Sequence, residues 1–331
     1  MRRRQHQQYS LRFGLRSRVL NTFNWRRLWR KISRNRLNLV ILLIIIGLAP
    51  PFFFHFRLTH FQQIQMKNCG WLASPPLVCA HGGDSINAFP NTVAAYRSAL
   101  RARVDCIEID VSRSADGFLF ALHDRDLQRI SGNHTARVGF WSKKAIKELD
   151  ASLHFPGVSD EQKVPTVEDA LTLVSNTVRV VILDAKVGPP FYEKGLAEDI
   201  LAVVKKINCF NCVIWAKSDH LVREITRLSP ETTVGYIIMK DPVTGYRSNV
   251  LRMKRAKVVG VYHPLIDEKL VQILHGRSKK IFAWTVDDTV SMLDMLSNNV
   301  DGVVTSNPAL FQQLMDDTRV RCLEDGFSVP R

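Results

Sequence analysis

The chain has 331 residues, enough for one large domain or two smaller ones, and its formal net charge is +15. The charge is uneven, because residues 1–36 contain twelve Arg or Lys and no acid, so this tail carries twelve of the fifteen net positive charges. The basic composition therefore gives no reason to expect that the remainder of the chain binds nucleic acid.

Residues 37–56 follow the basic tail and read LNLVILLIIIGLAPPFFFHF. The segment from Leu37 to Phe54 is apolar apart from Asn38, which is close to the minimum length for crossing a bilayer. The positive-inside rule then predicts a single-pass membrane anchor, with the tail of residues 1–36 in the cytosol and the chain after residue 56 lumenal or extracellular. A cleaved signal peptide and an Arg-rich organelle transit peptide are the alternatives.

Residues 57–76 are expected to form a stalk, and from residue 77 short β-branched runs alternate with longer helical stretches. The expected strands are 76–80, 106–111, 118–122, 178–185, 212–216, 233–238, 258–262, 281–286 and 302–305. The expected helices are 92–103, 142–149, 167–175, 193–206, 219–228, 266–276, 288–298 and 308–317.

This β/α alternation predicts an α/β fold, a TIM (β/α)8 barrel over residues 77–318 followed by a tail at 319–331. Nine strands are expected for eight places. Because 106–111 and 118–122 are separated only by a short connection that ends in Ser-Ala-Asp-Gly, too short for a crossover helix, those two should form a hairpin. A doubly wound open sheet is the alternative.

Polar side chains are concentrated at the carboxyl ends of the expected strands, where barrel enzymes place their sites. Glu108 and Asp110 lie two residues apart on one strand and therefore point to the same side, as do Asp184 and Lys186 on another. His81 and His123 end two further strands. Three carboxylates could bind Ca²⁺ or Mg²⁺, two histidines could act as general acid and general base, and a lysine could bind a phosphate. Together they indicate cleavage of a phosphodiester.

Six cysteines lie beyond the apolar segment, where a non-cytosolic compartment permits disulfides. Cys209 and Cys212 form a lone C-x-x-C, for which a local disulfide, half a metal site and a redox pair are the alternatives, a structural role being favoured. Asn133 begins an Asn-His-Thr sequon and is a predicted glycosylation site if this side of the membrane is lumenal.

The ordered motifs of residues 77 to about 315 resemble the glycerophosphodiester phosphodiesterase family, in particular its membrane-anchored plant branch. The family's His-Arg-Gly, Pro-Glu-Asn-Thr, Glu-x-Asp and His-Asp motifs match His81-Gly82-Gly83, Phe89-Pro90-Asn91-Thr92, Glu108-Ile109-Asp110 and His123-Asp124. Its later motifs match Asp184-Ala185-Lys186, Trp284-Thr285-Val286-Asp287 and Asn299-Val300-Asp301-Gly302-Val303-Val304-Thr305-Ser306.

The resemblance implies a TIM barrel that hydrolyses glycerophosphodiesters to an alcohol and glycerol 3-phosphate through a cyclic intermediate. It also implies roles for seven residues: acid–base catalysis by His81 and His123, metal binding by Glu108, Asp110 and Asp184, phosphate contact by Lys186, and a glycerol pocket lined by Trp284. The second hypothesis is a membrane-tethered barrel that binds phosphodiesters or polymer with little turnover.

The chain departs from the family pattern at three positions. Gly82 stands where the family has Arg, Pro90 where it has Glu, and Asp184 where it has a Glu that is one methylene longer. These differences bear on rate and substrate choice more than on the fold.

Overall fold

The computed structural model describes residues 36–154, 162–247 and 249–328 and divides the chain into two compact units, Met1–Gln62 and Gln63–Arg331. The predicted basic tail, apart from Arg36, lies outside the described residues. In the first unit the chain is helical from Arg36 onward, and this helix, α2, extends over Arg36–Cys69. It includes Pro50 and Pro51 and continues through most of the predicted stalk.

Among the described residues, α2 is the helix that is long and apolar enough to cross a membrane by length and composition. Its apolar stretch has a mean hydropathy of 2.4 and none of it is buried within the protein. Large side chains such as Ile44, Leu48 and Phe54 are exposed, as expected of a helix that packs against lipid.

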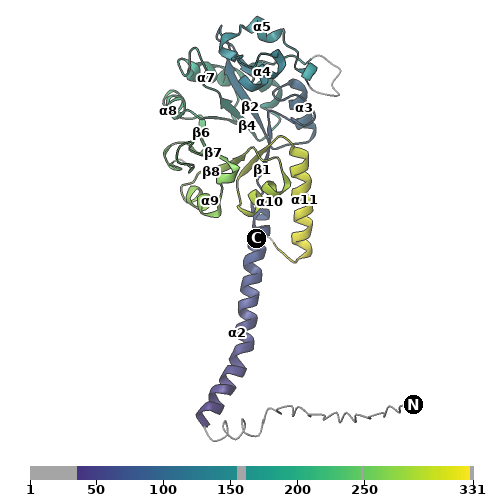
Figure 1. The fold of residues 1–331 in the computed structure, drawn as a ribbon, viewed down its shortest axis with the longest axis vertical. Coiled ribbons are helices and arrows are strands. Elements are labelled where there is room, and N and C mark those ends of the chain that lie inside the picture. Colours follow the sequence, from purple (N-terminus) through teal and green to yellow (C-terminus); the bar gives the residue numbers. More distant parts are fainter. Residues whose placement is uncertain (1–35, 155–161, 248, 329–331) are drawn as a thin grey trace, which may run out of the picture. The chain divides into compact units, whose positions relative to one another are not determined.

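The second unit contains a nine-stranded sheet that closes on itself (Figure 1). Its strands are β1 (Leu77–His81), β2 (Cys106–Arg113), β3 (Leu119–Ala121), β4 (Val180–Ala185), β5 (Cys212–Ala216), β6 (Thr233–Ile238), β7 (Val258–Tyr262), β8 (Lys280–Trp284) and β9 (Gly302–Thr305). The parallel strand β1 pairs with both β9 and β2, which closes an eight-stranded barrel. The predicted TIM barrel is therefore confirmed and the open sheet is wrong.

The expected hairpin is also present. Strand β3 pairs antiparallel with β2, Val111 lying opposite Ala121, and so stands outside the ring of eight parallel strands. The short connection leaves no room for a crossover helix, which explains why nine strands occupy eight barrel positions.

Helices surround the barrel (Figure 1). They are α3 (Val93–Arg101), α4 (Asp124–Ser131), α5 (Lys143–Lys147), α6 (Val167–Val174), α7 (Leu196–Ile207), α8 (Asp219–Leu228), α9 (Glu268–His275), α10 (Thr289–Ser297) and α11 (Pro308–Glu324), with 3-10 turns η1 (Gly70–Ala73), η2 (Val138–Phe140), η3 (Ala151–His154) and η4 (His263–Leu265). Helix α4 was not predicted, and α11 extends into the predicted tail.

Strand β2 shows how the two-residue period separates the two faces of the barrel wall. Ile107, Ile109 and Val111 belong to the large cluster under the helices, whereas Cys106 belongs to a smaller cluster inside the barrel. Glu108 and Asp110 share the inner face with Cys106 because side chains alternate along a strand. The predicted division of this strand into an apolar and an acidic face is therefore present.

Aromatic rings fill the barrel interior below the acidic residues. The rings of Trp215 and Phe282 meet edge to face with centroids 6.4 Å apart. Glycines face them: a Cβ at Gly260 would lie 2.9 Å from the Trp215 ring and one at Gly302 would lie 2.5 Å from the Phe282 ring. The small residues thus leave room for a packed floor, on which the site rests.

Two disulfides lie in the second unit. Cys209 pairs with Cys212, so the C-x-x-C is a local disulfide in this structure rather than half a metal site. Cys69 pairs with Cys322, joining the end of α2 to α11 across 253 residues of sequence.

Candidate active site

Three carboxylates meet at the carboxyl-terminal rim of the barrel. Glu108 and Asp110 extend from β2, and the register places Asp184 of β4 directly beside Asp110. All three are buried, and each offers an oxygen such that these atoms lie within 4.8 Å of one another. The predicted metal ligands are therefore brought together.

Lys186 lies against two of these carboxylates. Its Nζ is 2.6 Å from Oδ1 of Asp110 and also contacts Oδ2 of Asp184. Burial alone would lower the pKa of Lys186, but the neighbouring carboxylates outweigh it and raise that pKa well above its usual value. Burial likewise opposes ionisation of Asp110, yet Lys186 and the two nearby histidines hold its pKa far below the ordinary range.

Glu108 is the carboxylate whose negative charge is least compensated by the protein. Burial, followed by repulsion from Asp110, raises its pKa well above the usual value, although the backbone N–H of Gly82 donates a 2.9 Å hydrogen bond to its Oε2. A divalent cation would favour the charged form, because the added positive charge offsets both effects.

The donor set fits a hard divalent cation. Carboxylate oxygens are the ligands that Ca²⁺ and Mg²⁺ prefer. In addition, Oδ1 of Asp184 is buried and has no hydrogen-bond partner among the described residues. A buried acceptor without a donor is uncommon, and a bound cation would account for it.

His81 ends β1 beside the carboxylates. Burial lowers the pKa of its imidazole, with attraction to Asp110 opposing this in part, so the ring is neutral at pH 7. Within the described residues neither ring nitrogen has a hydrogen-bond partner, which leaves the ring available to accept a proton from a ligand.

His123 follows β3 and is the N-cap of α4. Its Nδ1 accepts a 3.2 Å hydrogen bond from the backbone N–H of Arg125, so Nε2 is the nitrogen left to meet a ligand. Burial lowers the pKa of His123 to about 4, against the opposing attraction of Asp110. The helix cap thus fixes both the direction of the ring and its tautomer.

These side chains line one small cavity of about 60 Å³. Its lining includes six of the predicted site residues, namely His81, Glu108, His123, Asp184, Lys186 and Trp284. Asp110 lies directly behind Lys186. Asn133 is elsewhere, in an exposed turn after α4, where its Oδ1 accepts a 2.9 Å hydrogen bond from the hydroxyl of Thr135.

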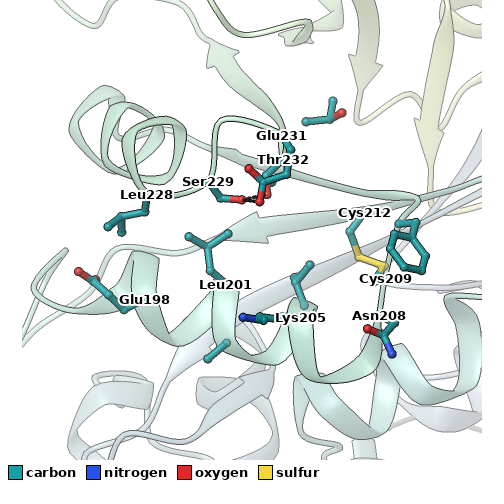
Figure 2. Close-up of a pocket in the computed structure, with 14 residues that line it drawn as sticks. Glu198, Leu201, Lys205, Asn208, Cys209, Cys212, Leu228, Ser229, Glu231 and Thr232 are labelled. Atoms are coloured by element: carbon teal, nitrogen blue, oxygen red, sulfur yellow. Dashed lines mark hydrogen bonds between the residues drawn. A yellow bond between two sulfur atoms is a disulfide. The ribbon is translucent and has the colours of Figure 1, made fainter.

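A much larger cavity of about 600 Å³ is separate from this site. It lies between α7 and the loops that lead into β5 and β6, beside the Cys209–Cys212 disulfide (Figure 2). Its lining has no histidine and none of the three clustered carboxylates. The largest cavity volume therefore does not mark the candidate active site, which lies at the opposite end of the barrel.

Asn91 is a site residue whose role the sequence analysis missed. Its Nδ2 donates a 2.8 Å hydrogen bond to Oδ2 of Asp110, while its Oδ1 accepts from the backbone N–H of Asp110 and from the hydroxyl of Tyr96. The side chain therefore orients one predicted metal ligand. Its place in the Phe89-Pro90-Asn91-Thr92 motif was the available signal.

Arg125 and Lys217 also line the cavity and were not predicted. Arg125 is the second residue of α4, the helix that the sequence analysis did not expect, and Lys217 directly follows β5. Neither position is marked by a local pattern in the sequence.

The structure gives a reason for the absence of a side chain at Gly82. The residue has a positive φ of 62°, and a Cβ there would lie 3.0 Å from Cβ of Pro90. The departures at these two positions are therefore spatial neighbours, because the loop that contains Pro90 packs against the backbone of Gly82.

The closed parallel barrel and the acidic cluster at its carboxyl-terminal rim define a TIM-barrel enzyme with a candidate divalent-cation site. Comparison with known proteins agrees with this class. The model of the glycerophosphoryl diester phosphodiesterase family matches residues 81–310. The chain belongs to this family.

Relatives support the assignment. The chain is 58% identical over 298 residues to the glycerophosphodiester phosphodiesterase GDPD4 of Arabidopsis thaliana, covering 90% of this chain and 91% of that protein. It is 30% identical over 233 residues to a glycerophosphodiester phosphodiesterase of Caldanaerobacter subterraneus subsp. tengcongensis, covering 70% of this chain and 94% of that protein. The plant-type branch of the family is thus supported.

Solved structures show the same fold. A phosphodiesterase of Oleispira antarctica, solved in complex with the product sn-glycerol-3-phosphate, superposes with a TM-score of 0.61 at 22% identity, covering 73% of this chain and 97% of that one. A glycerophosphodiester phosphodiesterase of Agrobacterium tumefaciens gives a TM-score of 0.59 at 23% identity, covering 72% and 99%.

Proposed function

We propose that this protein hydrolyses glycerophosphodiesters to an alcohol and sn-glycerol 3-phosphate. The observation that carries the proposal is the convergence of three buried carboxylates, a lysine and two histidines on one cavity at the barrel rim. The family of the chain supports the reaction class. The structure of the Oleispira antarctica phosphodiesterase contains its product, sn-glycerol-3-phosphate, which supports the same product here.

Glu108, Asp110 and Asp184 would hold the divalent cation, Ca²⁺ or Mg²⁺. When bound, it would supply positive charge that polarises a phosphoryl oxygen. Lys186 would add a second positive charge beside the phosphate, since its pKa keeps it protonated at neutral pH. Trp284, at the end of β8, would line the part of the pocket that takes glycerol.

The two histidines would move the protons. Neutral His81 would take the proton of the glycerol 2-hydroxyl as its oxygen forms a bond to phosphorus. His123 would act in its protonated form, which the anionic phosphodiester favours, and would deliver the Nε2 proton to the departing alcohol oxygen. In the second step water would attack phosphorus of the cyclic phosphodiester and the bond between phosphorus and the 2-oxygen would break. The two histidines would exchange roles: His123 would take the proton of water and His81 would return its proton to the 2-oxygen. The product would be sn-glycerol 3-phosphate.

The test uses the full chain purified in detergent, with glycerophosphocholine and glycerophosphoinositol as separate substrates. Release of glycerol 3-phosphate should require added Ca²⁺ or Mg²⁺ and should stop when EDTA removes the ion. If the wild type releases no more product than the His81→Ala variant from either substrate, hydrolysis is contradicted. That result would favour the alternative, a tethered barrel that binds phosphodiesters or polymer with little turnover.

For the location of the protein, the proposal is a single-pass membrane protein. Helix α2 would anchor it, the basic tail would be cytosolic, and the catalytic domain, predicted over residues 77–318, would be lumenal or extracellular. Two disulfides support this side of the membrane, because disulfides persist in oxidising compartments. A glycan on exposed Asn133 belongs to the same proposal. The expected partners are the small-molecule substrate and the membrane, without nucleic acid.

A further inference from the structure

Two cations at the mouth of the catalytic cavity have no part in the reaction proposed above. Arg125 and Lys217 line the cavity together with His81 and Lys186, but unlike Lys186 both are exposed to solvent. They come from α4 and from the end of β5, so two separate elements of the barrel rim direct positive charge at the same opening.

Neither cation is well neutralised by the protein. Among the described residues no carboxylate lies within ion-pair distance of Lys217, whose Nζ is 5.9 Å from the centre of the Trp284 ring. Nε of Arg125 is 4.0 Å from Oδ2 of Asp126, at the limit of an ion pair, and Asp126 also faces Arg129 at 3.5 Å. Burial and then the charge of Lys186 lower the pKa of Lys217, as expected where cations gather.

The charges of the loaded site do not balance. Three carboxylates, Glu108, Asp110 and Asp184, are matched by three cations, Lys186, Arg125 and Lys217. Asp126, beside Arg125, is closer to Arg129, and these two opposite charges cancel in the count. A divalent ion adds two positive charges and the phosphodiester group removes one, which leaves one positive charge unmatched. With its two cations exposed at the mouth, this excess favours a further anion on the substrate.

The size of the cavity indicates which part of the substrate meets these cations. About 60 Å³ is small compared with the several hundred ångström cubed of pockets that enclose a whole ligand. In the proposed reaction the phosphate and glycerol would fill this buried part, and the second alcohol would extend through the mouth, which Arg125 and Lys217 line.

Resting on the proposed function, we infer that the enzyme selects glycerophosphodiesters whose second alcohol carries an additional negative charge, such as a phosphomonoester. A cationic head group such as choline meets like charge at the same place and is disfavoured. The selectivity resides in side chains outside the carboxylate and histidine cluster.

The experiment compares two substrates that differ by one phosphate, glycerophosphoinositol 4-phosphate and glycerophosphoinositol, with the full chain in detergent and Ca²⁺ or Mg²⁺. At low ionic strength, kcat/KM for the phosphorylated substrate should be about tenfold higher, since the added phosphate meets two exposed cations and exposed charge pairs are individually weak. The ratio should decrease toward one in about 1 M salt, where the screening length is about 3 Å.

The double variant Arg125→Gln and Lys217→Gln should reduce this ratio to near one. The matched control, Arg277→Gln with Lys280→Gln, removes the same two charges from exposed positions at the start of β8 and should keep the ratio. A wild-type ratio at or below one, or an equal loss on both substrates in the double variant, overturns the inference while leaving hydrolysis in place.

Failure of the proposed function has a different signature. Absence of hydrolysis of both substrates, with either ion, would overturn the function itself. The charge preference is then decided by binding: calorimetric titration of the His81→Ala variant with the two compounds should still give about a tenfold difference in Kd. Equal affinities would overturn the inference independently of turnover.

Discussion

Glu108 lies at the point where burial and repulsion act together on one side chain. Without a cation, its pKa is raised by burial and by Asp110, so its ionisation costs the folded protein stability. With a cation, the same carboxylate becomes a ligand. The balance between these two states makes this residue the most direct test of the predicted metal site.

The Glu108→Gln variant should lose metal-dependent hydrolysis by about a thousandfold or more while remaining folded. In chelator its Tm should equal or exceed that of the wild type, because the amide removes a buried, poorly compensated carboxyl group. Adding Ca²⁺ or Mg²⁺ should raise the Tm of the wild type but not that of the variant. Thermal unfolding followed by circular dichroism gives both readings.

Glu198→Gln is the matched control, because Glu198 is exposed on α7 beside the larger cavity. It should keep both the activity and the metal-dependent increase in Tm. A Glu108→Gln chain that fails to fold in chelator would assign Glu108 a structural role and contradict the metal site.

Asp126 offers a test of pH dependence near the site. Its side chain is 2% exposed, and burial raises its pKa to about 6 despite the attraction of Arg125 and Arg129. A carboxyl group whose pKa is higher in the folded state stabilises the fold only while protonated, so stability decreases as pH rises from about 4 to about 6. The cost above pH 6 is about 3 kcal/mol.

Asp126→Asn should therefore be more stable than the wild type at pH 7.5 and should lose this advantage at pH 4. The measurement is urea unfolding at the two pH values. The control Asp317→Asn, on the exposed side of α11, should change stability by less than about 0.5 kcal/mol at both. An advantage that is equal at the two pH values would contradict the assignment of the effect to this carboxyl group.

At the scale of elements, the two disulfides close loops of very different length. Cys69–Cys322 joins the end of α2 to α11 over 253 residues, whereas Cys209–Cys212 spans 3. Loop closure restricts the unfolded chain more when the loop is long, so the first bridge should contribute more stability than the second.

Cys69→Ala with Cys322→Ala should lower the free energy of unfolding by about 2–5 kcal/mol, and Cys209→Ser with Cys212→Ser by about 1–2 kcal/mol. Denaturant unfolding of the oxidised wild type and of the two double variants measures both losses in the free energy of unfolding. The reduced wild type, which lacks both disulfides, is measured for comparison. A larger loss from the short loop would show that packing of the buried Cys209 and Cys212, and not loop entropy, determines its contribution.

Helix α4 is the element that connects fold and site most closely. It caps itself with His123, presents Arg125 at the cavity and buries Asp126. The position of His123 at a strand end predicted its role in the site. The helix that follows was not predicted, because the run from Asp124 to Ser131 is short and highly charged. The role of the ring as a cap, and hence its tautomer, consequently came from the structure.

At the scale of the whole molecule, the predicted orientation across the membrane has a direct test. Asn133 is exposed and hydrogen-bonded within its own sequon. If the barrel is lumenal, expression in a glycosylating host should give a chain whose mass decreases on endoglycosidase treatment, and Asn133→Gln should remove this shift. A wild-type chain without a glycan from that host would count against the orientation.

Local spacing in the sequence determined the alternation of strands and helices, the hairpin of β2 and β3, and the pairing of Glu108 with Asp110 on one strand face. These features have periods of two to four residues, so they depend on neighbours along the chain. The motifs around His81, His123 and Lys186 likewise marked the correct strand ends.

The tertiary structure decided what spacing could not. Parallel pairing of β4 with β2 brings Asp184 next to Asp110 across 74 residues of sequence. The folded barrel also brings Arg125 and Lys217 to one opening and Asn91 to Asp110, while the docking of α11 pairs Cys69 with Cys322. Such contacts join residues that no local pattern relates, because they arise only when strands distant in sequence become neighbours in the closed sheet.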